Sequence, residues 1–501
     1  MNKEQRENQE GRPGAPGQKP EGSGSAALDE NLEPGTLHPD KNLAPRIENL
    51  GETGGAARGE NLEPSIENLE EKRGASLPQH SNSSAELRSA DPFFSGRKHF
   101  PALDGLRGLA ILLVLATHYV MVAPTANWFE RGIKSICNHG WAGVDLFFVL
   151  SGFLITGILY DCKGQESYFK NFYARRTLRV FPLYYGFLAV LLLVMLAVKL
   201  SSNWVSDAPH LANLWRVQPY LWTYTFNIAC AFGHGSAHLG QLWSLSVEEQ
   251  FYLIWPLVIF ACSRKTAMRV CVVLIFTALL LRLVLTLFVP QVDVYFLTPT
   301  RMDPLAMGAL AALLIRAPGR LNISVRTVAG IFLAASALLA FRFTLALFTK
   351  AMDHAPVHTH TAAMLPSWKN LWDNVFIFSV VGVLFVCLLL LTILPGSIFQ
   401  RPFSKFFSAS SLRTAGKYSY GWYVFHFPLW TFSITSLIWL HQLRTVHNSL
   451  AIYLAFVAAN FFISLSMAIG SYHLYERHFL KLKRKFPERV AATATAISVD
   501  H

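Results

Sequence analysis

An arginine and a histidine, Arg107 and His118, lie eleven residues apart within one apolar stretch of the sequence. In an α-helix, eleven residues span about three turns plus 20°, so both side chains lie on one face, about 16 Å apart along the axis. Ionisable groups in a membrane helix are costly and usually face a cavity or a partner. The pair therefore predicts a passage with a cation near one end and a titratable base near its middle. A packing histidine and an arginine that reaches lipid phosphate remain alternatives.

Three more arginines, Arg175, Arg176 and Arg179, precede another apolar run. Their spacings of three and four residues let the guanidinium groups converge on one helix face. Clustered guanidinium groups suit phosphate recognition. Orientation of the chain in the bilayer and contact with anionic lipid would use the same residues, so that interpretation stays open.

Two adjacent carboxylates, Glu248 and Glu249, enter an apolar helix that begins at Trp243. Neighbouring residues of a helix diverge by about 100°, so only one of the two can face a given cavity. A buried carboxylate can orient a histidine and stabilise its imidazolium form. The alternative is an acidic residue that the dipole at a helix N-terminus favours.

Other polar residues mark the outer ends of apolar segments. Asp145 begins one, and Arg301 and Asp303 begin another, where a local ion pair could explain both charges. His426 is a second imidazole in an apolar run and fits a packing role as well as a functional one. Three histidines between residues 353 and 360 are interrupted by a proline, so we predict no metal site there.

The composition predicts a membrane protein preceded by a polar tail. Of the 501 residues, 52% are hydrophobic and 15% charged. Residues 1–96 contain too few apolar side chains to offset the entropy of ordering, so we expect a disordered tail. Residues 97–480 contain repeated runs near the ~20 residues that span a bilayer, and residues 481–501 are a basic tail. We predict an all-α, multi-pass transmembrane bundle of about ten spans, near 103–123, 141–160, 181–200, 243–262, 270–289, 302–316, 327–348, 373–395, 418–440 and 451–474.

The charge distribution predicts orientation rather than nucleic-acid binding. The net charge is +12, and the basic residues concentrate in alternate loops. By the positive-inside rule these loops are cytoplasmic, so we expect both termini in the cytoplasm and the protein in the plasma or inner membrane. We expect residues 211–228 to form an interfacial or re-entrant piece. The six cysteines lack ligand spacing and predict neither a zinc site nor a disulfide framework.

Together these motifs resemble those of acyltransferase family 3, a family of integral membrane proteins. The resemblance runs in order from about Phe100 to Phe479 and leaves the N-terminal tail outside. Some members carry a further extracytoplasmic domain, which we expect this chain to lack. The matching motifs are Leu103-Asp-Gly-Leu-Arg107-Gly with His118, Gly143-Val-Asp145-Leu-Phe-Phe-Val-Leu-Ser151-Gly-Phe, Arg176-Thr-Leu-Arg179, Trp243-Ser244-Leu-Ser-Val-Glu248-Glu249-Gln-Phe-Tyr and Tyr418-Ser-Tyr-Gly-Trp-Tyr-Val-Phe-His426.

The resemblance implies an enzyme that moves an acyl group, commonly acetyl, from cytoplasmic acyl-coenzyme A to a hydroxyl of a glycan or glycolipid. It implies His118 as the central base, Glu248 or Glu249 as a supporting acid, and no bound cofactor. The phosphates of coenzyme A would stay at the arginine-rich mouth, and its thin pantetheine arm would run towards His118. The residues expected to contact donor or acceptor are Arg107, Arg175, Arg176, Arg179, Asp145, Ser151, Trp243, Ser244, Asp303, Tyr418 and His426.

Two functions follow from these residues. In an O-acyltransferase, His118 takes the proton of the acceptor hydroxyl, and both direct transfer and a covalent acyl-enzyme fit the sequence. In a transporter or channel, the same buried charges would relay protons or ions. Secondary transporters often have paired halves, and the two halves of this chain lack clear similarity, which weighs against transport.

Overall fold

The computed structural model describes residues 100–120, 128–201, 209–316, 324–348, 371–394, 398, 400–439 and 449–487. Within these residues the chain is helical and has no strand, which confirms the all-α prediction. The predicted tail of residues 1–96 and the histidines between residues 353 and 360 lie outside the described residues. All six cysteines are free.

The α-helices occur at every predicted span. They are α1 (Pro101–Tyr119), α2 (Trp128–Asn138), α3 (Ala142–Asp161), α4 (Tyr168–Ser201), α5 (Pro209–Trp222), α6 (Phe226–Ala231), α7 (Trp243–Ala261), α8 (Arg264–Phe288), α9 (Met302–Ile315), α10 (Val325–Phe348), α12 (Ile377–Ile393), α13 (Gln400–Phe407), α14 (Ser410–Trp439), α16 (Leu450–Ser471) and α17 (Arg477–Leu482). Short 3₁₀ or π turns join some of them: η2 (His139–Trp141), η4 (Gly240–Leu242), η5 (Pro299–Arg301), η6 (Trp372–Phe376), η7 (Tyr472–Glu476) and η8 (Lys483–Lys485).

Ten is an approximate count of the spans. In the described part of the chain, seven helical segments are long and apolar enough to cross a membrane. The other three predicted spans coincide with α7, α9 and α14. Helix α9 has 14 residues, or about 21 Å of length, against a hydrocarbon core of about 30 Å. Residues 211–228, predicted as interfacial or re-entrant, lie mostly in α5 and α6.

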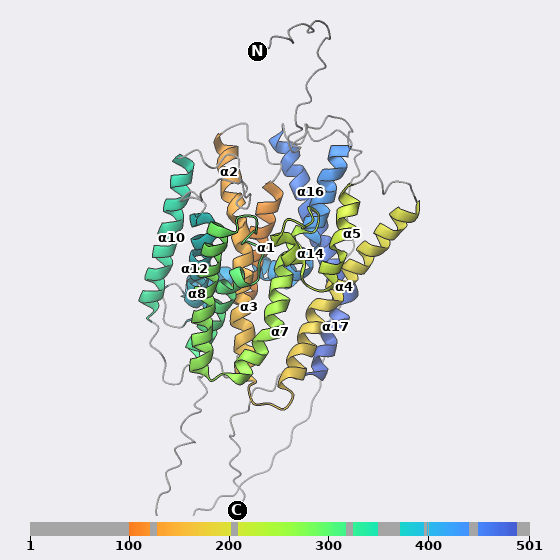
Figure 1. Ribbon diagram of the computed structural model, residues 1–501. Helices are drawn as coiled ribbons and strands as arrows, with labels where there is room; N and C mark the ends of the chain where they lie inside the picture. Colours follow the sequence, from red (N-terminus) through yellow and green to blue (C-terminus); the bar gives the residue numbers. More distant parts are fainter. Residues whose placement is uncertain are drawn as a thin grey trace, which may run out of the picture. The chain divides into compact units, whose positions relative to one another are not determined.

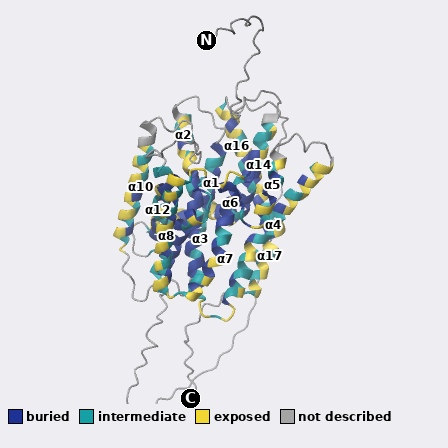
Figure 2. Cartoon of the chain, in the orientation of Figure 1, coloured by how far each residue is buried: buried dark blue, intermediate teal, exposed yellow. Residues whose placement is uncertain are grey.

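Burial separates central helices from peripheral ones. In the most apolar window of the segment that contains α3, 72% of residues are buried, against 11% in α10. Figure 1 shows α1 and α3 between other helices and α10 at the margin, and Figure 2 shows the same contrast as dark blue against yellow. Helix α1 packs against α14 and α3, and α3 packs against α9 and α7. The functional candidates of the sequence lie mainly on these central helices.

The close approach of α1 and α14 depends on glycine. A Cβ added at Gly108 would lie 2.1 Å from the Leu412 oxygen, and one at Gly416 would lie 1.8 Å from the Asp104 oxygen. Real side chains cannot occupy such positions, so glycine lets the two backbones touch, as small residues do in membrane helix pairs. This contact holds the N-terminal half of α1 against the N-terminal half of α14.

Candidate active site

The two intramembrane histidines, 308 positions apart in the sequence, form a hydrogen-bonded pair. His118 lies in the last turn of α1, and His426 lies midway along α14. His118 Nδ1 is 3.1 Å from His426 Nε2, and the ring centroids are 5.0 Å apart. The His118 and Phe427 rings pack in a T-shaped arrangement with their centroids 4.5 Å apart. His426 is fully buried, whereas His118 is half-buried and so keeps access to its surroundings.

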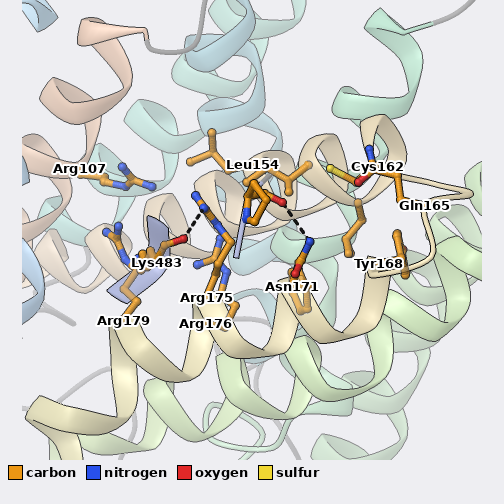
Figure 3. Close-up of a pocket in the computed structure, with 14 residues that line it drawn as sticks. Arg107, Leu154, Cys162, Gln165, Tyr168, Asn171, Arg175, Arg176, Arg179 and Lys483 are labelled. Atoms are coloured by element: carbon orange, nitrogen blue, oxygen red, sulfur yellow. Dashed lines mark hydrogen bonds between the residues drawn. The ribbon is translucent and has the colours of Figure 1, made fainter. Parts of the chain in front are cut away.

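At the other end of α1, Arg107 joins an arginine-lined cavity of about 180 Å³. The cavity lies between α1, the end of α3, the start of α4 and the residues after α17. Arg107, Arg176 and Arg179 interact electrostatically, and Figure 3 shows all three at the cavity. The lining residues are Arg107, Leu154, Ile158, Leu159, Cys162, Gln165, Tyr168, Asn171, Phe172, Arg175, Arg176, Arg179, Lys483 and Pro487.

The positive charge of this cavity is only partly compensated. Arg107 forms an ion pair with Asp104 at 3.1 Å. Within the described residues, Arg176 and Arg179 make no hydrogen bond or ion pair. The Arg176 guanidinium lies over the Tyr252 ring, 5.1 Å from its centroid, which leaves its N–H groups for other partners. Glu248, Glu249 and Glu476 interact electrostatically with these arginines without forming an ion pair in the described residues, so the guanidinium N–H groups stay open to an anion such as phosphate.

Arg175 has a different environment from its neighbours. Its Nη1 donates to the backbone oxygens of Phe486 at 3.0 Å and Lys483 at 3.4 Å. Asn171 donates to the Pro487 oxygen at 3.0 Å, and Figure 3 shows this bond and that of Arg175 with Lys483 as dashed lines. We call residues 483–487 the C-terminal strap. Arg175 was expected to contact the ligand directly, and the structure uses it to hold the strap that supplies one wall of the cavity.

The two adjacent glutamates have different surroundings, as the helical geometry predicts. Glu248 accepts hydrogen bonds from Ser151 at 2.9 Å and from Tyr252 at 3.0 Å. The Tyr252 and Ser151 hydroxyl oxygens also lie 3.0 Å apart. Glu249 interacts electrostatically with Tyr224 and with other tyrosines. A glutamate was expected to orient His118, but in the structure the ring is held by His426 and by a backbone hydrogen bond with Val114.

Two candidate acids belong to buried ion pairs. Asp145 pairs with Arg301 at 2.7 Å, and Asp303 pairs with Arg282 through both carboxylate oxygens at 2.9 Å. All four side chains are fully buried. The expected local pair between Arg301 and Asp303 does not form. Arg301 pairs with Asp145 of α3, and Asp303 pairs with Arg282 of α8. Ser379 adds a hydrogen bond to Asp303 at 2.6 Å.

Trp243 belongs to the same buried network. Its ring packs on the Arg301 guanidinium, which lies among four aromatic rings at 4.2–5.9 Å: Phe148, Trp243, Tyr295 and Phe378. These contacts join α3, α7, α9 and the start of α12. Asp145, Asp303 and Trp243 were expected to contact the ligand; in the structure Asp145 and Trp243 contact the buried Arg301, and Asp303 pairs with the buried Arg282.

The last two candidates are also occupied by protein partners. Ser244 and Tyr423 share a hydroxyl–hydroxyl contact of 2.6 Å. Tyr418 bonds His473 Nε2 at 3.1 Å. Ser244 is close to the histidine pair through Tyr423, because the Tyr423 ring lies 5.6 Å from that of His426. Tyr418 lies about two turns before His426, towards the N-terminus of α14.

Three residues of these sites were not among the predicted site residues: Arg282, Tyr252 and Lys483. A signal existed for Arg282, since an arginine in the middle of an apolar run requires a buried partner. Tyr252 ends the motif that begins at Trp243, but its contacts with Ser151 and Arg176 come from separate helices, and the motif does not predict them. Lys483 was assigned to the basic tail of residues 481–501, and in the structure it lines the cavity.

Comparison with known proteins identifies the family. The family model described as an acyltransferase domain matches residues 100–469. The chain belongs to this acyltransferase family. The match covers every motif on which the resemblance to acyltransferase family 3 rests, and it confirms that expectation.

Curated relatives of the chain are O-acetyltransferases. Peptidoglycan O-acetyltransferase OatA of Listeria monocytogenes is 32% identical over 353 residues, 67% of this chain and 50% of the relative. The putative peptidoglycan O-acetyltransferase YrhL of Bacillus subtilis is 34% identical over 230 residues, 43% of this chain and 33% of the relative. O-acetyltransferase OatA of Staphylococcus aureus is 27% identical over 354 residues, 69% of this chain and 53% of the relative. The match thus spans about half the length of these relatives or less. No solved structure matches the chain.

Proposed function

We propose that this protein is a membrane O-acyltransferase that moves an acyl group, most simply acetyl, from acyl-coenzyme A to a hydroxyl of a glycan. One observation carries the proposal: helix α1 bears an undercompensated arginine cavity at one end and a hydrogen-bonded imidazole at the other. The two groups are eleven residues, or about 16 Å, apart. A donor with a phosphorylated head and a long thin arm matches that spacing.

The donor head is assigned to the arginine cavity. Arg107, Arg176 and Arg179 offer forked N–H donors to phosphate oxygens, and Lys483 adds a further cation from the strap. The cavity is smaller than a whole nucleotide, so it fits the phosphate part and leaves the nucleoside at the opening. By the positive-inside rule this end faces the cytoplasm, where acyl-coenzyme A is present.

His118 is assigned as the general base. The acceptor hydroxyl would lose its proton to the imidazole as its oxygen attacks the thioester carbonyl, and general-base catalysis of this kind contributes about 10²–10⁴-fold. Glu248 is assigned to the donor side, since it neighbours Ser151, Tyr252 and the arginines rather than His118. Membership of an acyltransferase family favours this chemistry over a transport relay.

The acceptor class follows from the relatives. Their names specify peptidoglycan, a glycan rich in hydroxyl groups, and we propose an acceptor of that type. The proposal places the catalytic domain at residues 97–480 in the plasma or inner membrane, with both termini cytoplasmic. The acceptor then reaches His118 from the outer side.

Purified protein in nanodiscs tests the assignment. With [¹⁴C]acetyl-coenzyme A and soluble peptidoglycan fragments, the wild type should transfer label to the glycan. His118→Ala should lose at least about 10²-fold in rate while its thermal midpoint stays near that of the wild type. A matched control is His139→Ala, because His139 lies in η2 and bonds the Ser135 backbone oxygen. Full transfer by His118→Ala would refute the role of His118.

A further inference from the structure

His426, the fully buried histidine of the pair, has a defined proton position. His426 Nδ1 lies 2.9 Å from the Tyr423 oxygen and 3.1 Å from the Trp422 oxygen. Carbonyl oxygens only accept hydrogen bonds, so His426 Nδ1 must carry a proton. His426 is fully buried, and within the described residues no carboxylate bonds either ring. A neutral ring is therefore the form that burial favours, because a buried charge without a counter-charge is costly.

The proton position on His426 determines the proton position on His118. A neutral imidazole with its proton on Nδ1 has a lone pair on Nε2. His426 Nε2 therefore accepts, and His118 Nδ1, 3.1 Å away, donates. We infer that His426 is a positioning residue that fixes the tautomer of His118 and leaves His118 Nε2 as the basic nitrogen. The inference rests on the proposed function and names the atom that performs it.

Packing supports the same orientation of the ring. His118 lies against the buried His426 on one side and against the Phe427 edge on another. Its Nδ1 faces His426, so Nε2 is on the opposite edge of the ring, and the half-buried state of His118 leaves an approach to it. Both partner rings come from α14, which the glycine contacts hold against α1.

The proton balance of the reaction fits this arrangement. The acceptor O–H proton goes to His118 Nε2 as the new C–O bond forms. The C–S bond then breaks, and Nε2 returns the proton to the departing sulfur, which gives the free thiol. Between these steps His118 is an imidazolium, and its Nδ1–H bond to His426 becomes charge-assisted. In triads a carboxylate has this orienting role; here a neutral histidine fixed by backbone oxygens has it.

The tautomer is measurable without any reaction. Protein labelled with ¹⁵N-histidine is placed in nanodiscs, and the His118 signals are found by difference against His118→Gln. The expected spectrum has a protonated Nδ1 and an unprotonated Nε2. A protonated Nε2 in the wild type would overturn the inference, even if the protein proves to be an active acyltransferase. Conversely, the expected tautomer in a protein without transfer activity would leave the positioning role intact and refute the proposed function.

Two substitutions of His426 test the coupling. His426→Gln keeps an acceptor oxygen near the Nε2 position, whereas His426→Leu removes the acceptor. We expect His426→Leu to lower kcat at least about tenfold and to give a mixture of His118 tautomers. His426→Gln should keep more of the rate and more of the wild-type tautomer. Equal kcat values for His426→Leu and the wild type, with thermal midpoints matched, contradict the inference; if either variant fails to fold, the wild-type spectrum decides.

Discussion

Two groups of arginines lie in this molecule, and they have opposite surroundings. Arg282 and Arg301 are fully buried, and each is paired with an aspartate of another segment. Arg176 and Arg179 line a cavity and make neither hydrogen bond nor ion pair within the described residues. In sequence both groups are cations beside apolar helices. The two groups differ in their partners rather than in their charge. An arginine paired with a buried aspartate holds helices together, whereas an arginine without such a partner is available to bind an anion.

The energetic consequences also differ. A buried ion pair is costly to break because removing one partner leaves an uncompensated charge in the interior. The cavity arginines repel one another, and Arg176 and Arg179 have no ion-pair partner in the described residues, so removing one of these guanidinium groups costs the fold little. Substitutions in the buried ion pairs should therefore lower stability, and substitutions of the cavity arginines should weaken ligand binding.

The largest expected effect is on stability, from Asp303→Asn. This change leaves the fully buried Arg282 without its counter-charge, and we expect the free energy of unfolding to fall by about 3–5 kcal/mol. Chemical denaturation in detergent measures it. The double variant Arg282→Met/Asp303→Leu, which removes both charges, should recover much of the loss. An Asp303→Asn protein as stable as the wild type would break the comparison.

The next effect is on donor binding, from Arg107→Gln or Arg176→Gln. Each change removes one charged donor to phosphate, worth roughly 1.5–3 kcal/mol, so coenzyme A should bind about 10- to 100-fold more weakly. The thermal midpoint should stay within about 2 °C of the wild type, because the change relieves repulsion. Isothermal titration with coenzyme A measures the first quantity. Unchanged affinity in both variants counts against the cavity as the donor site.

A smaller effect is expected from Arg175→Gln, which acts through the C-terminal strap. The loss of its bonds to the strap should weaken coenzyme A binding by about fivefold, corresponding to roughly 1 kcal/mol. Asn171→Ala loosens the same segment and should act in the same direction. If Arg175→Gln instead matches the loss of Arg176→Gln, then Arg175 contacts the donor directly.

The smallest effect is expected from Ser151→Ala. Glu248 loses one hydrogen-bond donor and keeps Tyr252, so the rate of transfer should fall by no more than about fivefold, or roughly 1 kcal/mol. Steady-state kinetics with acetyl-coenzyme A measures it. Loss of all transfer in a stable Ser151→Ala protein would give this serine a larger role than hydrogen bonding to Glu248.

Local features of this molecule were predictable from sequence, and distant pairings were not. Apolar runs predicted the helices, because the hydrophobic effect acts on each segment by itself. Arg175, Arg176 and Arg179 were predicted as one phosphate-binding group from their spacing, and the family resemblance added Arg107 at the same mouth. Two pairings depend on how helices far apart in sequence pack. One is the His118–His426 bond, and the other is the pairing of Arg301 and Asp303 with residues of other helices instead of with each other. The glycine contact between α1 and α14 determines the first, and no periodicity of a single helix contains that information.

Donor selectivity tests the central claim most directly, because it pairs the arginine cavity with the phosphates it is proposed to bind. The rate of His118-dependent transfer is compared for acetyl-coenzyme A and for acetyl-pantetheine, which has the thioester arm without phosphates. In the wild type, acetyl-coenzyme A should be the better donor by kcat/KM, and in Arg107→Gln/Arg176→Gln this preference should fall by at least about tenfold while acetyl-pantetheine is used as before. An unchanged preference in that variant would contradict the account.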